Sequence, residues 1–157
     1  MTRRVDPPAT WPIECRLGSG LLGHSLFSVG EQEFCRVAER HPRVRAYVKN
    51  HSLGLDVPYR YGSEMRIYRP DFIVLVDDGH GEADPLHLIV EIKGYRREDA
   101  KDKKSTMEND WVPGVNNLQH YGRWAFAEFT DIYQMDADFK AKVASEFERM
   151  LAAACAP

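Results

Sequence analysis

Two apolar runs joined by a short turn constrain the fold of this chain more than any other feature. The first run ends at Val76, the second extends from Leu86 to Ile92, and the residues between them are rich in Asp and Gly. An apolar run is typical of a strand inside a sheet, and Asp-Gly segments favour turns. The two runs are therefore predicted to form an antiparallel hairpin, and a register centred on residue 81 places Asp71 near Glu91.

The residues before this hairpin predict one helix followed by strands. A helix that ends near Pro42 is predicted because its residues repeat at the spacing of one helical face, which carries Glu31, Phe34, Cys35 and Ala38. Branched and aromatic residues favour strands over residues 44–48, 57–61 and 67–76. Prolines and a Gly-Ser-Gly loop predict an irregular arm over residues 1–23, and residues 24–157 are expected to form a single domain.

The residues after the hairpin predict a helix, a strand and a closing helix. Charged residues 98–109 favour a helix, which Pro113 and Gly114 are expected to interrupt or kink before residues 115–121. Residues 124–129 fit a strand or a helix, and the flanking turn residues favour the strand. Residues 136–154 have helical spacing. This order predicts an α/β fold with a mixed central sheet, flanking helices and an extra C-terminal helix.

Composition and charge exclude several classes of protein. Hydrophobic residues at 43% and charged residues at 29% argue against disordered and collagen-like chains. A net charge of -3 argues against nucleic-acid binding through overall charge, although local basic patches remain open. The scattered cysteines are expected to be free thiols. Since neither a membrane span nor a secretory signal is evident, a cytoplasmic protein without membrane partners is expected.

Three ionisable residues are predicted to converge at one end of the hairpin, where its first strand begins and its second strand ends. Glu91 and Lys93 share one face of their strand, and the register brings Asp71 beside Glu91. Asp71 and Glu91 are oxygen donors suited to Mg²⁺, and Glu31 on the first helix is a further candidate ligand. Lys93 is suited to orient a water or to stabilise phosphate charge. This set fits metal-assisted hydrolysis of a phosphodiester, and a structural salt-bridge cluster is the alternative.

Basic residues outnumber acidic residues from Glu91 to Lys104, the stretch that leaves the hairpin and enters the following helix. The candidates for contacts with DNA phosphates there are Arg96, Arg97, Lys101, Lys103 and Lys104. An ordinary solvated helix face would have the same pattern. Gln119 is a further candidate for a hydrogen bond near the metal or a phosphate, with a plain surface amide as the alternative.

The pair Pro70-Asp71, followed by Glu91-Ile92-Lys93, resembles the signature of the PD-(D/E)XK nuclease superfamily. Four blocks in order resemble the C-terminal endonuclease region of type III restriction enzyme restriction (Res) subunits: residues 47–50, 68–72, 91–94 and 111–116. The resemblance implies a restriction-endonuclease-like αβββαβ core and cleavage of double-stranded DNA that depends on Mg²⁺, with Mn²⁺ as a substitute. It also implies metal-binding or catalytic roles for Asp71, Glu91 and Lys93, with Glu31 as the acid of the helix.

The chain departs from that family in having no Gly-x-x-x-x-Gly-Lys-Ser/Thr loop of an ATP-driven translocase. A separate translocase and a separate modification subunit are therefore expected partners. Two functions stay open: a restriction-type Mg²⁺-dependent DNA endonuclease, and a non-catalytic module that binds DNA or docks on such a partner. A nuclease with the same core that acts on RNA or in repair is a third, weaker interpretation.

Overall fold

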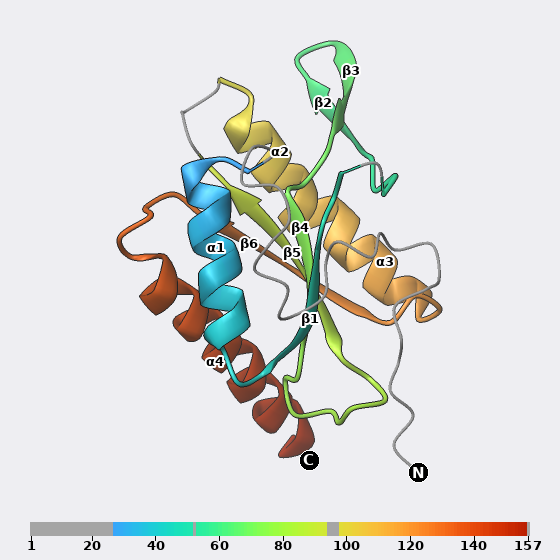
Figure 1. Ribbon diagram of the computed structural model, residues 1–157. Coiled ribbons are helices and arrows are strands. Elements are labelled where there is room, and N and C mark those ends of the chain that lie inside the picture. Colours follow the sequence, from blue (N-terminus) through green and yellow to red (C-terminus); the bar gives the residue numbers. More distant parts are fainter. Residues whose placement is uncertain (1–26, 52, 94–97, 157) are drawn as a thin grey trace.

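The computed structural model describes residues 27–51, 53–93 and 98–156 (Figure 1). The predicted arm over residues 1–23 lies outside the described residues. The elements in chain order are α1 (Val29–Arg40), β1 (Val44–Lys49), β2 (Val57–Tyr61), β3 (Glu64–Tyr68), β4 (Phe72–Val76), β5 (Leu86–Ile92), α2 (Ala100–Thr106), the π-helical segment η2 (Met107–Trp111), α3 (Val112–Leu118), β6 (Arg123–Phe129) and α4 (Met135–Ala154).

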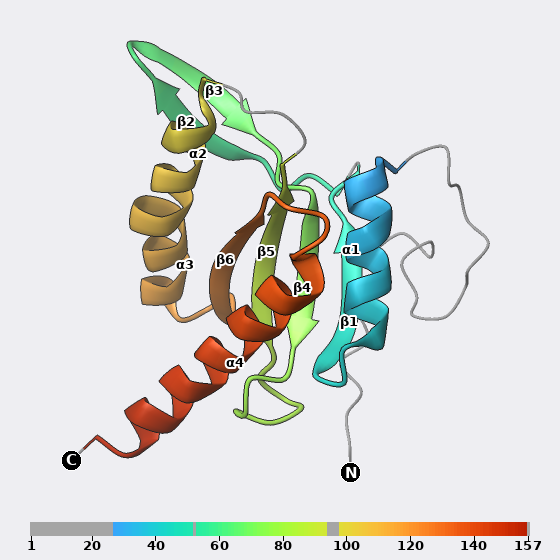
Figure 2. The same ribbon diagram turned by 90° about the vertical axis from the view of Figure 1, so that its left-hand side faces the viewer.

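A mixed sheet with helices on both faces forms the body of the molecule. The described strands give a four-stranded sheet in the order β1-β4-β5-β6, in which the β5–β6 pair is parallel and the other pairs are antiparallel. Helices α1 and α4 pack on one face, where Phe34 and Phe139 meet Phe72 and Phe129. The α2–α3 helical run covers the other face (Figure 2). The predicted mixed α/β architecture is confirmed.

The predicted central hairpin is confirmed together with its register. Phe72 pairs with Val90 and Val76 pairs with Leu86, so Asp71 and Glu91 follow as the next residues in register. The β4 strand is buried along its whole length, as expected of a central strand. Connectivity has therefore placed the two acidic residues side by side at one end of the sheet.

The prediction of one strand over residues 67–76 is wrong. The first part of this stretch belongs to β3, which pairs with β2 in a separate two-stranded sheet, and β4 begins only after Asp71. Pro70 lies between the two strands, and proline cannot donate to a sheet ladder. The chain therefore changes direction at Pro70, and the β2–β3 hairpin extends beyond the main sheet (Figures 1 and 2).

The prediction that Pro113 and Gly114 interrupt the helix is also wrong in part. Helical structure continues from Ala100 to Leu118 through the η2 segment. The N–H of Val112 donates to the carbonyl of Met107, five residues earlier, which is the wider π pattern. Pro113 directly follows this segment as the second residue of α3, so the wider helical turn lies next to the residue that cannot donate an N–H.

The later elements follow the sequence pattern. The ambiguous segment before Phe129 is the strand β6, because its parallel pairing with β5 buries Ala125, Phe126 and Ala127. The face of the closing helix α4 that packs on the sheet includes the buried residues Phe139 and Val143. None of the helices within the described ranges is long and apolar enough to cross a bilayer.

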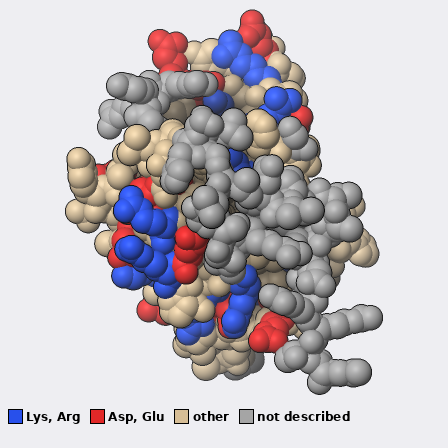
Figure 3. Space-filling model, viewed as in Figure 1, with Lys and Arg blue, Asp and Glu red and all other residues tan. Residues whose placement is uncertain are grey.

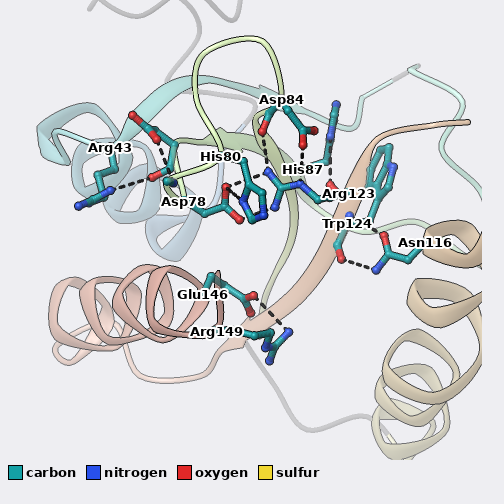
Figure 4. Close-up of polar contacts among 12 residues, drawn as sticks. Arg43, Asp78, His80, Asp84, His87, Asn116, Arg123, Trp124, Glu146 and Arg149 are labelled. Atoms are coloured by element: carbon teal, nitrogen blue, oxygen red, sulfur yellow. Dashed lines mark hydrogen bonds and ion pairs between the residues drawn. The ribbon is translucent and has the colours of Figure 1, made fainter. Parts of the chain in front are cut away.

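Ion pairs close the end of the sheet that lies away from Asp71 and Glu91 (Figure 4). Arg123 at the start of β6 donates to both carboxylate oxygens of buried Asp78, at 2.5 and 2.9 Å, and to Asp84 at 2.9 Å. Burial raises the pKa of Asp78, but the hydrogen bonds from Arg123 and His80 outweigh this effect and hold the pKa below its usual value. This buried carboxylate is therefore fully compensated, which makes it a structural residue.

Candidate active site

A cleft of about 670 Å³ opens where β4 begins and β5 ends, below the β2–β3 hairpin. Its lining includes all four residues predicted to carry the chemistry, namely Glu31, Asp71, Glu91 and Lys93. Further parts of the wall come from Ile67, Tyr68, Arg69, Lys103, Lys104 and Glu128. In Figure 1 this region is the upper end of the sheet, between the starts of α1 and α2.

Backbone contacts hold Asp71 in place from both neighbouring strands. Its Oδ2 accepts a hydrogen bond from the N–H of Ile92 at 2.7 Å, and its carbonyl accepts one from the N–H of Asn50 at 2.8 Å. Charge-assisted bonds to backbone N–H groups are among the stronger hydrogen bonds in proteins. The carboxylate of Asp71 is thus fixed against the end of β5, next to Glu91.

A buried tyrosine positions Glu91. The hydroxyl of Tyr68, at the end of β3, donates to Glu91 Oε2 at 2.7 Å, and the tyrosine is 4% exposed. Burial, followed by the neighbouring charge of Glu91, raises the pKa of Tyr68 far above its ordinary value. The tyrosine therefore remains a hydrogen-bond donor at every working pH.

The two carboxyl groups lie in a site that disfavours their charged forms. Burial raises the pKa of Glu91 to about 7, the charge of Asp71 adds to this rise, and the Tyr68 hydroxyl and Lys103 oppose it. Burial likewise raises the pKa of Asp71, and the charge of Glu31 adds to that rise, against the Ile92 N–H and Lys49. The direction is opposite to that of Asp78, because at Asp71 and Glu91 the effect of burial outweighs that of the neighbouring hydrogen bonds and lysines.

Lys93 is paired with a residue that the sequence reasoning missed. Its Nζ lies 2.6 Å from Glu128 Oε2, and the two side chains are only 21% and 13% exposed. Glu128 lies in β6 directly beside Glu91 in the parallel register. A glutamate inside an otherwise apolar strand was the available signal, but its neighbours across the sheet depend on a register that the sequence does not reveal.

Glu31 reaches the cleft from the other side of the sheet. The side chain of Ser28 caps α1 by accepting from the N–H of Glu31, and Lys49 forms an ion pair with the Glu31 carboxylate. The described part of the chain contains no group of three or more His, Cys, Asp or Glu side chains arranged to hold a metal. The structure thus groups Asp71 and Glu91 as adjacent acids, with Glu31 held by a lysine.

The predicted DNA-contact residues divide into three groups. Lys103 and Lys104 line the cleft, where Lys103 Nζ lies 3.2 Å from Asp99 and Lys104 Nζ lies 3.8 Å from Glu108. Lys101 is exposed on α2 outside the cleft lining. The remaining arginine candidates, Arg96 and Arg97, lie outside the described residues.

Of the two interpretations of Gln119, the structure fits the plain surface amide, because the residue is exposed and lies away from the cleft. Gln119 ends α3 in a left-handed conformation, with φ of 56°, and α3 leads into the start of β6. The start of β6 pairs with Leu86, whereas the cleft lies at the Ile92 end of β5. About 27 Å of helix separates Gln119 from the start of α2 at the cleft.

The arrangement has the chemistry of a site for a hard divalent cation and an anionic substrate. Two half-buried carboxyl groups with raised pKa values would be stabilised as carboxylates by a bound cation, and Mg²⁺ needs only one or two such ligands. The alternative interpretation, a structural salt-bridge cluster of Asp71, Glu91 and Lys93, does not appear among the ion pairs of the described residues, where Lys93 pairs with Glu128. Comparisons with models of protein families, with curated proteins and with solved structures gave no match.

Proposed function

We propose that this chain is a Mg²⁺-dependent endonuclease that hydrolyses phosphodiester bonds of double-stranded DNA. The observation that carries the proposal is the juxtaposition of Asp71 and Glu91, two half-buried acids with raised pKa values, in a cleft that also contains Lys93. Acids with perturbed pKa values that lie together in a cleft are candidates for a functional site. We further propose that it belongs with the PD-(D/E)XK nucleases and serves as the nuclease part of a type III-like restriction system.

The donor set fits the proposed metal. Asp71 and Glu91 would hold Mg²⁺, or Mn²⁺ in its place, because carboxylate oxygens are the ligands that these ions prefer. The bound ion would lower the pKa of a water and neutralise charge on the phosphate. Tyr68 and the Ile92 N–H keep the two carboxylates oriented toward the cleft before any ion arrives.

Lys93 and Glu128 supply the remaining polar chemistry. The ion pair with Glu128 holds the Lys93 ammonium in position in a partly buried site. An ammonium at this place donates hydrogen bonds to phosphate oxygens and stabilises negative charge that builds up there. It also orients a water molecule for attack on phosphorus.

The order of elements agrees with a restriction-endonuclease-like core. When the β2–β3 hairpin is set aside, the chain runs α1, β1, β4, β5, the α2–α3 helical run and β6. This is the αβββαβ order, with the last strand parallel to its neighbour. The hairpin then is an insertion between the first and second strands of that core.

A second candidate is a non-catalytic module that binds DNA or docks on a separate translocase or modification subunit. Pairing of cleft lysines with acids favours it, because Lys93, Lys103 and Lys104 each have a carboxylate partner. On the face seen in Figure 3, Lys and Arg atoms also lie beside Asp and Glu atoms, without an unbroken basic surface. Such a chain would depend on a partner to hold DNA.

The decisive experiment is nicking of supercoiled plasmid by the purified chain with Mg²⁺, with Mn²⁺ and with EDTA. We expect metal-dependent nicking that Lys93→Ala abolishes. The matched control is Lys140→Ala on α4, which removes a lysine paired with Asp136 at 2.6 Å. This variant should nick plasmid at the wild-type rate. Failure of the folded wild-type protein to nick with either ion would refute the endonuclease proposal, and retained DNA binding would then favour the module.

A further inference from the structure

The β2–β3 hairpin is anchored on one face and open on the other. Its inner face carries Tyr59 and Tyr68, which are 3% and 4% exposed. The Tyr59 hydroxyl donates to Asp99 at 2.7 Å, just before α2, and Lys103 lies over both tyrosine rings. The hairpin is thus held firmly against the start of α2.

The outer face of the hairpin consists of Pro58, Arg60, Met65 and Ile67. Pro58 pairs with Ile67 and Arg60 pairs with Met65, so the four side chains point to the same side. Met65 and Ile67 are 64% and 58% exposed, which is high for large apolar residues two positions apart on one strand. Together with exposed Pro58, these two side chains form a continuous apolar surface on one side of the ribbon.

This outer face continues into the catalytic cleft. Ile67 lines the cleft, and so does Arg69, which follows the end of β3. The chain then passes through Pro70 directly to Asp71. A ligand that occupies the cleft and extends upward along the molecule in Figure 1 therefore meets the outer face of the hairpin.

The charges on the hairpin suit a phosphate-bearing ligand. Arg69 pairs with Asp56 at 2.6 Å and Arg66 pairs with Glu64 at 2.9 Å. Within the described residues, Arg60 makes no ion pair, although its side chain is exposed on the outer face. A cation without a partner beside apolar side chains matches a nucleic-acid groove, where phosphates border the apolar edges of sugars and bases.

We propose that the outer face of the β2–β3 hairpin enters a groove of the duplex next to the scissile phosphate. This inference rests on the proposed function, because it takes DNA as the substrate of the cleft. A two-stranded ribbon fits the major groove, which is about 12 Å wide. Arg60 contacts the backbone or a base edge, while Met65 and Ile67 make apolar contacts with the groove. The hairpin thereby aligns the duplex across Asp71 and Glu91.

The test measures binding of a fluorescent DNA duplex by anisotropy in a Lys93→Ala background, so that the duplex is not cut. The double variant Arg60→Ala and Met65→Ser should weaken binding about tenfold and reduce the salt dependence of Kd. Met65→Leu should bind as the parent does, because it keeps the apolar contact. Arg36→Ala on α1, which removes an exposed arginine paired with Glu33, is the charge-matched control and should also bind normally.

Two additional readouts separate this inference from the proposed function. Binding of Mn²⁺ by calorimetry should be the same in the hairpin variant and its parent, which shows an intact cleft. Nicking is compared with the hairpin substitutions made in the wild-type background. If the wild-type chain nicks plasmid and the hairpin substitutions change neither binding nor nicking, the hairpin inference is overturned while the endonuclease proposal stands. Reduced nicking with unchanged binding also overturns it. A wild-type chain that neither binds nor nicks DNA overturns both.

Discussion

Replacing Glu91 by glutamine should stabilise the metal-free protein at alkaline pH. The folded state raises the pKa of Glu91 from 4.5 to about 7, chiefly through burial and then through the charge of Asp71. The unfolded chain releases this proton near pH 4.5, whereas the folded chain retains it until about pH 7. Stability is therefore lost as pH rises between these values, and a neutral side chain at this position avoids the loss.

The size of the effect follows from the two pKa values. A rise in the pKa of Glu91 from 4.5 to about 7 lowers the free energy of unfolding by about 3 kcal/mol at pH 8 and by less than about 1 kcal/mol at pH 5. Glutamine still accepts the hydrogen bond from Tyr68, so little is lost in exchange. For a chain of this length, each kcal/mol shifts the melting temperature by about 2–4 °C, which gives an increase of up to roughly 10 °C at pH 8.

Thermal unfolding followed by circular dichroism in EDTA, at pH 8 and pH 5, measures this difference. Glu146→Gln is an informative control, because that buried glutamate lies 2.8 Å from Lys142 and 3.2 Å from Arg149, and its replacement should lower the melting temperature. An equal or lower melting temperature for Glu91→Gln at pH 8 would show that Glu91 is a compensated structural residue. The electrostatic argument for the site would then be wrong.

Three further predictions address other parts of the molecule. Asp71→Asn should weaken Mn²⁺ binding at least tenfold by calorimetry, and an unchanged isotherm would remove Asp71 from the ligand set. Glu128→Gln should leave Lys93 without its ion-pair partner and lower the rate of plasmid nicking while DNA binding is retained, so an unchanged rate would contradict its positioning role. Asp78→Asn should cost about 2–4 kcal/mol in urea unfolding because the Arg123 guanidinium loses a buried partner, and a loss below about 0.5 kcal/mol would contradict this account.

The sequence by itself determined the central hairpin and the meeting of Asp71 with Glu91. A loop over residues 77–85 joins the two apolar runs, so they pair as antiparallel neighbours, and a register centred within this loop brings Asp71 beside Glu91. The same holds for the inner stripe of α1, where Phe34 and Ala38 are fully buried as the helical spacing predicted. Both features depend on the spacing of residues close together in the chain, which a single sequence shows.

Only the tertiary structure decided what surrounds that pair. Tyr68 reaches Glu91 because the chain turns at Pro70 and sends β3 into a separate hairpin, although residues 67–76 read as one strand. Lys93 meets Glu128 because β6 lies parallel to β5, and a parallel neighbour arrives through a long helical connection. The length of such a connection does not set the register, whereas a loop between consecutive antiparallel strands narrows the possible registers. The acids of the site were therefore predictable, while their partners depended on contacts between distant segments.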